Sequence, residues 1–367
     1  MRGKLSLDGQ NKAILFQRKF LRTTQTITVI GLVVLAAGCG PQRAEPKASG
    51  PEGLLRQIEG QNGVEAVRAW SFDGHAGAVI ETRHYSLHTT LLDPLVATRL
   101  AGFVEAAYHA YQQSLPSPTE RGERMTVYLL ADRGQWESFT DTFAGSEAVI
   151  YKQIRKGAYC LRQTCVAYPI GIEQTLSALG HEGWHQFSAA HFVYRLPSWL
   201  DEGMATQFES YEVRQGRFVF RPDRNTMRLG GLKMAIERGG LIPLRALIEL
   251  NPGQVLDDDN TAAAFYSQVY ALTRYFQEAG SWGRQFRQML KDGLTGSWPV
   301  DSATGLALED RRAVLTGRMN GELSRQLFAR YFPGDTGQMQ GAYESYCRKI
   351  AETVVIKTQV WPTEKTK

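Results

Sequence analysis

The pattern of apolar and polar residues changes near residue 170. Before that point, residues 75–90 are rich in β-branched and apolar side chains, and "RMTVYLLADR" (124–133) is typical of a strand. Asp93-Pro94 between them is a helix-start signal, residues 134–143 fit a helix, and residues 148–169 suggest two or three short strands with turns. These elements predict an α+β lobe over residues 61–170.

From residue 171 onward the apolar positions recur with the period of a helix. The predicted helices span residues 175–187, 200–213, 227–237, 244–250, 261–279, 282–293 and 322–331. Strands first and helices afterwards predict an α+β fold in which a mixed sheet lies beside a helical lobe, residues 171–350, with a cleft where they meet. Residues 351–367 are predicted to form a C-terminal tail.

The first 38 residues have the layout of an export signal, because six basic residues precede an apolar run from Ile27 to Ala37. That run of about 11 residues is shorter than the roughly 20 that a membrane-spanning helix needs, which disfavours a permanent span. The ending "AAGC" resembles the bacterial lipobox, whose cysteine, here Cys39, becomes the acylated N-terminus. We therefore predict an envelope lipoprotein held to a membrane through its N-terminal lipid. The alternative is plain secretion, with Cys39 an ordinary thiol.

Composition changes this picture in two ways. Residues 39–60 include "GPQRAEPKASGPEG", which has little to bury and is predicted to be a flexible tether. The net charge of +5 belongs to residues 1–38, since the rest of the 367-residue chain has 36 basic and 36 acidic residues. A neutral mature chain lacks the basic excess of nucleic-acid-binding proteins, so no nucleic-acid partner is predicted.

Two cysteines lie close together in "YCLRQTCVAY". An exported protein meets an oxidising compartment, so we predict a structural disulfide between Cys160 and Cys165, with Cys347 unpaired. As zinc ligands the two would need a second cysteine pair, which the sequence does not supply.

The stretch "GHEGWHQ" carries the candidate chemistry. On a helix, His181 and His185 are four residues apart, so both rings can aim a nitrogen at one metal ion. Glu182 follows the first histidine, which gives the H-E-x-x-H arrangement, in which the glutamate is a base and not a ligand. The alternative is a helix with two structural histidines and a solvated acidic pair further on.

A catalytic zinc ion takes three protein ligands and leaves one position open. The segment "LPSWLDEGMATQFE" supplies Glu202 at the start of a second helix, one helix-loop-helix turn away. Asp201 and Glu209 are rival carboxylates, but Asp201 points about 100° away from Glu202 on a helix and Glu209 lies two turns further on. We therefore predict one Zn²⁺ ion, bound by His181, His185 and Glu202.

The motifs "HEGWHQ", "LPSWLDEGMATQFE" and "FYSQVYALTRYF" together resemble the gluzincin metallopeptidases, most closely an uncharacterised bacterial branch with a peptidase-like domain of unknown function. The resemblance covers residues 75–279, including "MTVYLLADRGQWESF". It implies a gluzincin-like fold whose sheet has an edge strand beside the metal. The Gly-x-Met-x-Asn segment of the aminopeptidase N-like branch is absent, and "GAYCL" stands near its expected place, so aminopeptidase specificity does not follow.

The resemblance also implies roles for individual residues. His181, His185 and Glu202 match the zinc ligands, Glu182 matches the general base, and Tyr266 in "YSQVYAL" matches a catalytic tyrosine. The expected activity is cleavage of peptides or proteins. The alternative is a non-catalytic, zinc-stabilised lipoprotein that binds a partner, but a structural zinc ion prefers a closed four-ligand shell and needs no base, so the intact Glu182 favours the enzyme.

Three other features indicate a function less strongly. The "DDDN" stretch, residues 257–260, could bind calcium but more commonly caps the following helix. Arg221, Arg224 and Arg228 could clamp a substrate carboxylate, although a solvated basic stretch is the default. Gly180 and Gly183 weaken their helix and so suggest crowding beside it. The spacing of the other histidines in the sequence does not bring them together at one metal site.

Overall fold

The computed structural model describes residues 50–119, 122–154, 157–255, 258–278, 280, 282–310, 316–334 and 336–354. Over these residues the chain has a mixed α+β fold, as predicted, with a six-stranded sheet, a two-stranded hairpin and a majority of helix. The predicted signal (1–38), Cys39 and most of the predicted tail lie outside the described residues.

The six-stranded sheet has the order β1-β2-β3-β4-β6-β5. Its strands are β1 (Val64–Phe72), β2 (His75–Thr82), β3 (Tyr85–Thr89), β4 (Met125–Leu129), β5 (Ala158–Leu161) and β6 (Thr164–Ala167). The first three strands form an antiparallel meander, β3, β4 and β6 run parallel, and β5 is an antiparallel edge strand. Strand β4 alternates buried and half-buried residues, which is the pattern of a strand with two unequal faces.

Four helices accompany the sheet: α2 (Gly50–Glu59), α3 (Pro94–Ser114), α4 (Arg133–Ala144) and α5 (Ala148–Tyr151). Helix α3 begins as predicted, because the Asp93 side chain accepts a hydrogen bond from the backbone N of Leu95. The predicted tether, residues 39–60, is wrong in its second part. Leu54 and Ile58 of α2 are buried, since their four-residue spacing gives the helix an apolar face.

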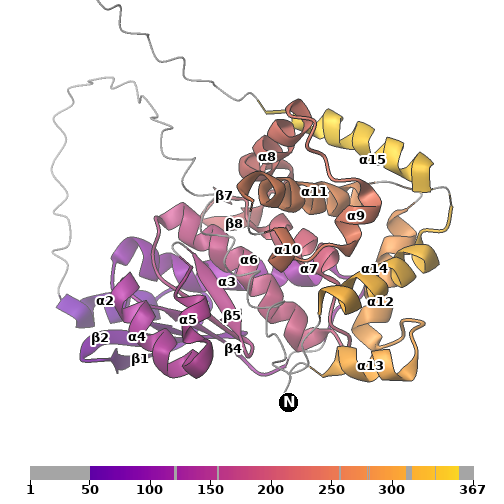
Figure 1. Cartoon of the computed structure of the whole chain (residues 1–367). Helices are drawn as coiled ribbons and strands as arrows, with labels where there is room; N and C mark the ends of the chain where they lie inside the picture. Colours follow the sequence, from indigo (N-terminus) through magenta and orange to yellow (C-terminus); the bar gives the residue numbers. More distant parts are fainter. Residues whose placement is uncertain are drawn as a thin grey trace, which may run out of the picture.

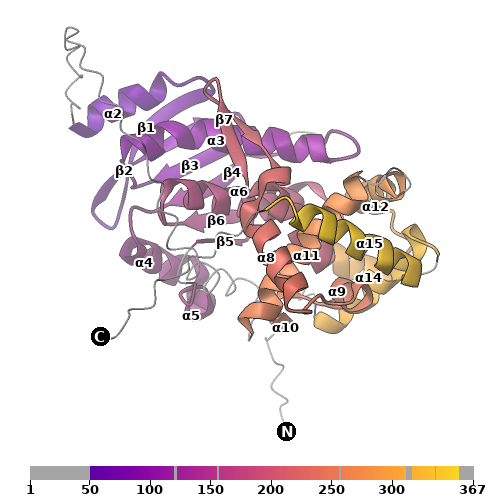
Figure 2. The same cartoon turned by 90° about the horizontal axis from the view of Figure 1, so that it is seen from above.

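The remaining helices build the second half of the molecule. They are α6 (Ile172–His191), α7 (Ser198–Ala205), α8 (Thr226–Glu237), α9 (Leu244–Glu249), α10 (Pro252–Val255), α11 (Asp259–Glu278), α12 (Gly283–Thr295), α13 (Ser302–Glu309), α14 (Gly317–Tyr331) and α15 (Thr336–Ala351). The short 3₁₀ helices are η2 (Gly145–Glu147), η3 (Thr206–Phe208) and η4 (Pro222–Arg224). The sheet with α2–α5 and the group α8–α15 lie side by side, and α6 runs between them (Figures 1 and 2).

One large core joins the two halves. Its buried apolar side chains run from the inner sheet face through α3 and α6 into α7 and α11, and a smaller cluster fills the space between the outer sheet face, α4 and α5. Helix α6 is therefore covered on both sides, and a side chain that it carries is held by both halves of the fold.

The predicted helix over residues 200–213 is wrong beyond Ala205. After η3 the chain forms a hairpin, β7 (Tyr211–Arg214) and β8 (Arg217–Phe220), whose turn contains Gln215 and Gly216 at φ angles of 51° and 76°. Tyr211 and Phe218 lie on the same face of the hairpin, and their rings lie 5.2 and 5.3 Å from the ring of Phe103 on α3. This packing stabilises the strand conformation of the segment over the predicted helix. Likewise, the first part of residues 148–169, predicted as strand, is helix α5.

Close packing explains the two glycines of α6. A Cβ atom on Gly180 would lie 2.2 Å from the carbonyl oxygen of Phe208, and one on Gly183 would lie 2.5 Å from the hydroxyl of Tyr111. The same Tyr111 hydroxyl donates a hydrogen bond to the Gly180 carbonyl at 2.8 Å. The crowding predicted from the sequence is confirmed, and α3 and η3 are its source.

Gly203→Ala is expected to lower the free energy of unfolding by about 1–3 kcal/mol, the usual cost of overpacking. A Cβ atom at Gly203 would lie 2.2 Å from Thr273 Oγ1 and 2.8 Å from the carbonyl oxygen of Val269, both on α11. Gly230→Ala on α8 is the control, since nothing lies within 4 Å of its Cβ position and it should be neutral or stabilising. Urea denaturation of both variants checks this, and equal midpoints would contradict it.

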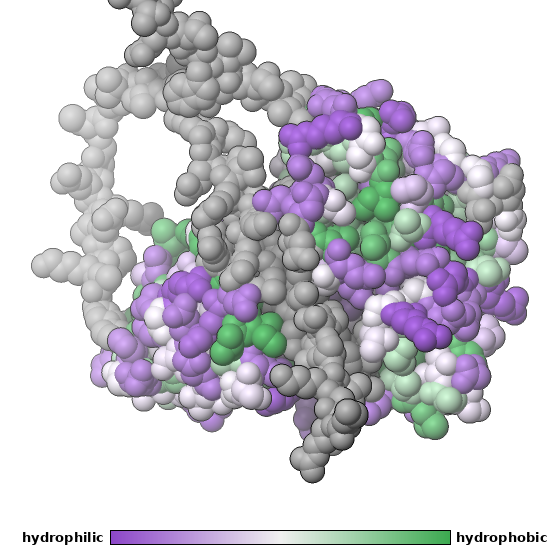
Figure 3. Space-filling view, viewed as in Figure 1, coloured by the Kyte–Doolittle hydropathy of each residue, from purple (hydrophilic) through white to green (hydrophobic). Residues whose placement is uncertain are grey.

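The visible surface is largely hydrophilic, with apolar side chains gathered over α11 and beside α5 (Figure 3). Among the described helices, none combines the length and the apolar composition that crossing a membrane demands.

Candidate metal centre

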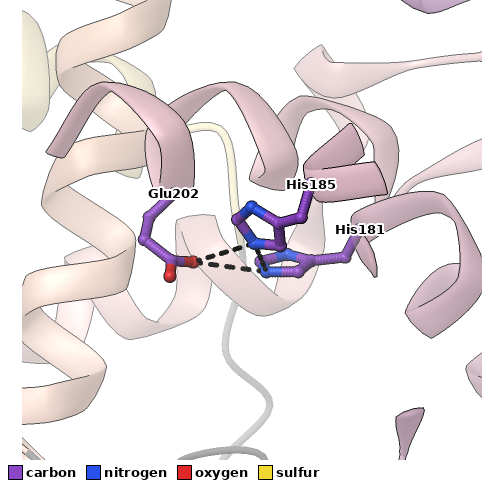
Figure 4. Close-up of side chains that lie close together, drawn as sticks. All are labelled: His181, His185 and Glu202. Atoms are coloured by element: carbon purple, nitrogen blue, oxygen red, sulfur yellow. Dashed lines mark hydrogen bonds and ion pairs between the residues drawn. The ribbon is translucent and has the colours of Figure 1, made fainter. Parts of the chain in front are cut away.

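Helices α6 and α7 bring the three predicted ligands together. His181 and His185 lie one turn apart on α6, with their Nε2 atoms 3.3 Å apart. Glu202 projects from α7 so that its Oε2 atom lies 3.3 Å from Nε2 of His181 and 3.6 Å from Nε2 of His185 (Figure 4). These three side chains form a group able to hold one metal ion. It is the one such group in the part of the chain that the structure describes.

The chemistry of this group fits a metal ion. Glu202 Oε2 is buried and has no hydrogen-bond partner among the described residues, although a buried carboxylate oxygen without a partner is costly. The oxygen faces two imidazole nitrogens, and two nitrogens with one carboxylate are a common donor set for zinc in an open site. A cation at this point would satisfy the oxygen, which accepts no hydrogen bond.

The outer nitrogen of His185 is held by Asp201. The distance from His185 Nδ1 to Asp201 Oδ2 is 3.1 Å. Oδ1 of the same carboxylate accepts hydrogen bonds from Trp184 Nε1 at 2.9 Å and from Ser188 Oγ at 3.2 Å. Asp201, one of the rival ligands in the sequence, therefore fixes the ring of a ligand from behind.

The outer nitrogen of His181 is held by the other rival, Glu209, at 2.8 Å from Nδ1 to Oε1. Glu209 Oε2 accepts hydrogen bonds from Asn225 Nδ2 and Arg228 Nε, both at 2.8 Å. The Arg228 side chain is 7% exposed. Arg228 is therefore neither the solvated residue nor the free substrate clamp that the sequence suggested. Its role and that of Asn225 were missed, and the signal for Asn225 was its N-cap position before α8.

Arg221 and Arg224 are also engaged within the protein. Arg221 Nη1 lies 2.7 Å from Glu212 and Nη2 lies 2.7 Å from Asp223. Arg224 lies 3.3 Å from the same Glu212 carboxylate. These pairs tie the β7–β8 hairpin to η4, so a carboxylate clamp from the three arginines is not formed.

The charges at the centre stabilise one another. Burial lowers the pKa of His181, but the neighbouring carboxylates of Glu202 and Glu209 outweigh burial and raise it to about 9. Burial raises the pKa of Glu202, but the two histidines outweigh it and lower the pKa to about 2. The site therefore favours positive charge between the imidazoles and the carboxylate, which is the charge that a metal ion supplies.

The predicted base and the predicted tyrosine border the same centre. Glu182 is 7% exposed, and burial raises its pKa although His185 and His181 oppose the shift. Tyr266 of α11 is 4% exposed, and its ring centroid lies 6.5 Å from that of His181. Burial raises the pKa of Tyr266 well above its usual value, so its hydroxyl is protonated at neutral pH.

The predicted disulfide is not formed in the structure. Cys160 and Cys165 are cross-strand partners in the β5–β6 pairing, yet they and Cys347 are free thiols. The Cys165 thiol instead donates to the backbone carbonyl of Glu182 and to the side chain of Gln186, both at 3.5 Å. Cys165 thereby links β6 to α6.

The acidic stretch before α11 acts as a helix cap. Asp258 Oδ2 accepts a hydrogen bond from the backbone N of Thr261 at 2.7 Å. Asp257 lies outside the described residues. The capping interpretation, rather than the calcium site, agrees with this contact.

Overall similarity adds nothing to the motif resemblance. Comparison of the chain with protein-family models, with curated proteins and with solved structures gives no match. The residues of this centre and their geometry are therefore what indicates a function.

Glu202→Ala is expected to abolish stoichiometric zinc binding, because it removes a ligand. Glu209→Gln is expected to retain zinc at about 10- to 100-fold lower affinity, since it only weakens the support of His181. Zinc content by mass spectrometry and competition with a chelating dye measure both effects. Full zinc in the Glu202 variant, with none in the Glu209 variant, would mean that Glu209 is the ligand and that Glu202 is not.

Proposed function

We propose that this protein is an exported, lipid-anchored zinc hydrolase of gluzincin type that cleaves peptide bonds. One observation carries the proposal: His181, His185 and Glu202 lie together in the interior, with His185 partly exposed, and the buried Glu182 follows His181 on the same helix. Glu182 is not a member of the ligand group, so a base remains beside the metal position. A purely structural site has no use for such a base.

Different residues of the chain have different roles in the reaction. His181, His185 and Glu202 would hold the ion, and zinc so held supplies a Lewis acid that polarises the scissile carbonyl and lowers the pKa of water. Glu182 accepts a proton from the water that adds to the carbonyl carbon. It then returns this proton to the leaving amine as the C–N bond breaks. Its raised pKa suits the first transfer, because a more basic carboxylate accepts the proton more readily.

The surrounding residues fix these groups in place. Asp201 and Glu209 set the orientation of the two imidazoles by binding their Nδ1 atoms. Tyr266 donates a hydrogen bond to the carbonyl oxygen as negative charge develops on it. Helix α6 is packed between both halves of the core, so the base and two ligands move little relative to each other.

Metal analysis joined to a cleavage assay tests this function. The purified protein should contain one zinc ion per chain and should cleave members of a peptide library. A chelator should stop cleavage and added zinc should restore it. A folded, zinc-loaded protein that leaves the whole library intact would instead support a binding role.

Cys39→Ala is expected to move the protein from the membrane fraction to the soluble fraction. Acyl chains contribute about 0.8 kcal/mol per buried CH₂ group, and the described helices offer no membrane span in their place. Cys347→Ala, a buried thiol far along the chain, is the control and should remain with the membranes. Fractionation followed by immunoblotting measures this, and an unchanged distribution of the Cys39 variant would contradict the lipid anchor.

A further inference from the structure

The Asp201 carboxylate is a point at which α6 holds α7. Trp184 and Ser188 donate hydrogen bonds to its Oδ1 atom at 2.9 and 3.2 Å. Nδ1 of His185 lies 3.1 Å from its Oδ2 atom. The spacings of three and four residues place these side chains on one face of α6. Asp201 precedes the ligand Glu202 in α7, so holding its carboxylate also fixes the backbone from which the third ligand projects.

The indole of Trp184 is fixed in direction by its packing. The side chain is fully buried, and its ring is stacked on that of Phe208 in η3 at 5.6 Å. It also lies 5.9 Å from the ring of Tyr111 on α3 and 6.2 Å from that of Phe192 at the end of α6. A ring held from several sides points its N–H in one direction, which here is toward Asp201.

A second buried tryptophan provides a comparison. Trp199 lies in the first turn of α7, is also fully buried, and packs with its ring 6.2 Å from the rings of Phe276 and Phe328. Its Nε1 atom has no hydrogen-bond partner among the described residues. Packing a large aromatic side chain into this core therefore does not by itself place a carboxylate beside the indole N–H. The contact of Trp184 with Asp201 is specific to the surroundings of the metal centre.

We propose that Trp184 is a positioning residue of the metal centre: its indole N–H, together with the Ser188 hydroxyl, holds the Asp201 carboxylate in place, and this orients His185 and places Glu202. The proposal rests on the proposed function in that both concern the same metal position. The Asp201 side chain is 26% exposed, so a carboxylate released by the indole can turn toward water. Two ligands then lose a common support.

Zinc affinity, measured by competition with a chelating dye, tests this role. Trp184→Phe keeps an aromatic ring and removes the N–H, and zinc should bind about tenfold more weakly, at the lower end of the effects of residues that support metal ligands. Trp199→Phe is the matched control, because it makes the same change in a buried indole without a described partner. It should bind zinc with nearly wild-type affinity. Equal losses in the two variants would mean that only packing is affected, and would overturn the proposal.

A double-mutant cycle shows whether the effect passes through Asp201. Asp201→Ala alone should weaken zinc binding by about 10- to 100-fold. Adding Trp184→Phe to that variant should weaken it no further, because the carboxylate that the indole holds is already gone. A merely structural role of Trp184 would produce the same loss with and without the Asp201 side chain, and that result would overturn the proposal.

The visible absorption spectrum of the cobalt-loaded protein provides a second measurement, because its bands depend on the geometry of the ligands. The spectrum should change in Trp184→Phe and stay as in the wild type in Trp199→Phe. A wild-type spectrum in the folded Trp184 variant would contradict a role in placing His185 and Glu202.

Ser188→Ala keeps the proposal testable if Trp184→Phe does not fold. It removes only a hydroxyl group, one of the two donors to Asp201 Oδ1. Zinc should bind about two- to tenfold more weakly, the usual effect of losing one hydrogen bond. The change should have no effect in the Asp201→Ala background. If Trp184→Phe does not fold, an unchanged zinc affinity in Ser188→Ala would overturn the proposal.

The failures of the two proposals differ, since zinc affinity is measured whether or not a peptide is cut. If the dependence on Asp201 appears but the wild-type protein cleaves no peptide, the positioning role stands and the peptidase fails. If the wild-type protein cleaves peptides but Trp184→Phe weakens zinc binding no more than Trp199→Phe, the peptidase stands and the positioning role fails.

Discussion

Glu182→Gln is expected to keep its zinc and to lower kcat/KM by about 10²- to 10⁴-fold, the usual contribution of a positioned general base. Glutamine has nearly the same shape as glutamate, but its amide cannot accept the proton of the attacking water. Glu182 is not one of the three side chains that converge on the metal position, so removing its charge leaves the ligand set intact. Steady-state kinetics on a library substrate and zinc analysis of the same sample measure the two effects.

Two comparisons make this result specific. Glu237→Gln, an exposed residue at the end of α8, should change neither quantity. His185→Ala should lose zinc and activity together, because it removes a ligand. If Glu182→Gln also loses its zinc, the residue has a structural role at the centre; if it turns over substrate at the wild-type rate, the base must be another group.

The grouping of His181, His185 and Glu202 could be predicted from the sequence because its geometry is local. The four-residue spacing of His181 and His185 places both on one face of a helix, whatever surrounds it. The predicted helix, residues 175–187, lies within α6 (Ile172–His191). Glu202 follows after a short connection, so few arrangements could keep it away from the histidines.

The roles of the rival carboxylates could not be predicted in this way. On sequence spacing, Glu209 was a competing ligand two turns beyond Glu202. Its actual position depends on the turn from α7 into η3 and on Asn225 and Arg228, which come from the region of α8 and bind its carboxylate. Such a contact depends on tertiary packing, and the spacing of charged residues along one segment cannot predict it.

The hairpin was missed for the same reason. Taken alone, the sequence of residues 200–213 favours a helix. The strand conformation places Tyr211, Phe218 and Phe220 against Phe103, which is more than 100 residues earlier in the chain. The miss matters for function, because this hairpin forms one wall of a cavity beside the metal centre.

Tyr266→Phe is expected to lower kcat by about 10²- to 10³-fold while zinc content and KM change little. The substitution removes only the hydroxyl, which we propose donates to the carbonyl oxygen as charge develops on it. The position suits this role: the ring lies 6.5 Å from that of His181, and the Arg228 guanidinium lies 5.0 Å from the ring centroid. Burial keeps the hydroxyl protonated by raising its pKa.

Tyr270→Phe, one turn further along α11, is the matched control. The Tyr270 hydroxyl donates to the carbonyl of Pro222 at 2.5 Å and so serves the packing of α11 on η4. Its loss should reduce the free energy of unfolding by about 1 kcal/mol and leave kcat near the wild-type value. A catalytic hydroxyl and a structural one are thereby separated, because the first variant should change kcat without changing stability in proportion. Near-normal turnover in Tyr266→Phe would make Tyr266 one more core aromatic, and the donor to the carbonyl oxygen would then have to be sought among the other groups that border the centre.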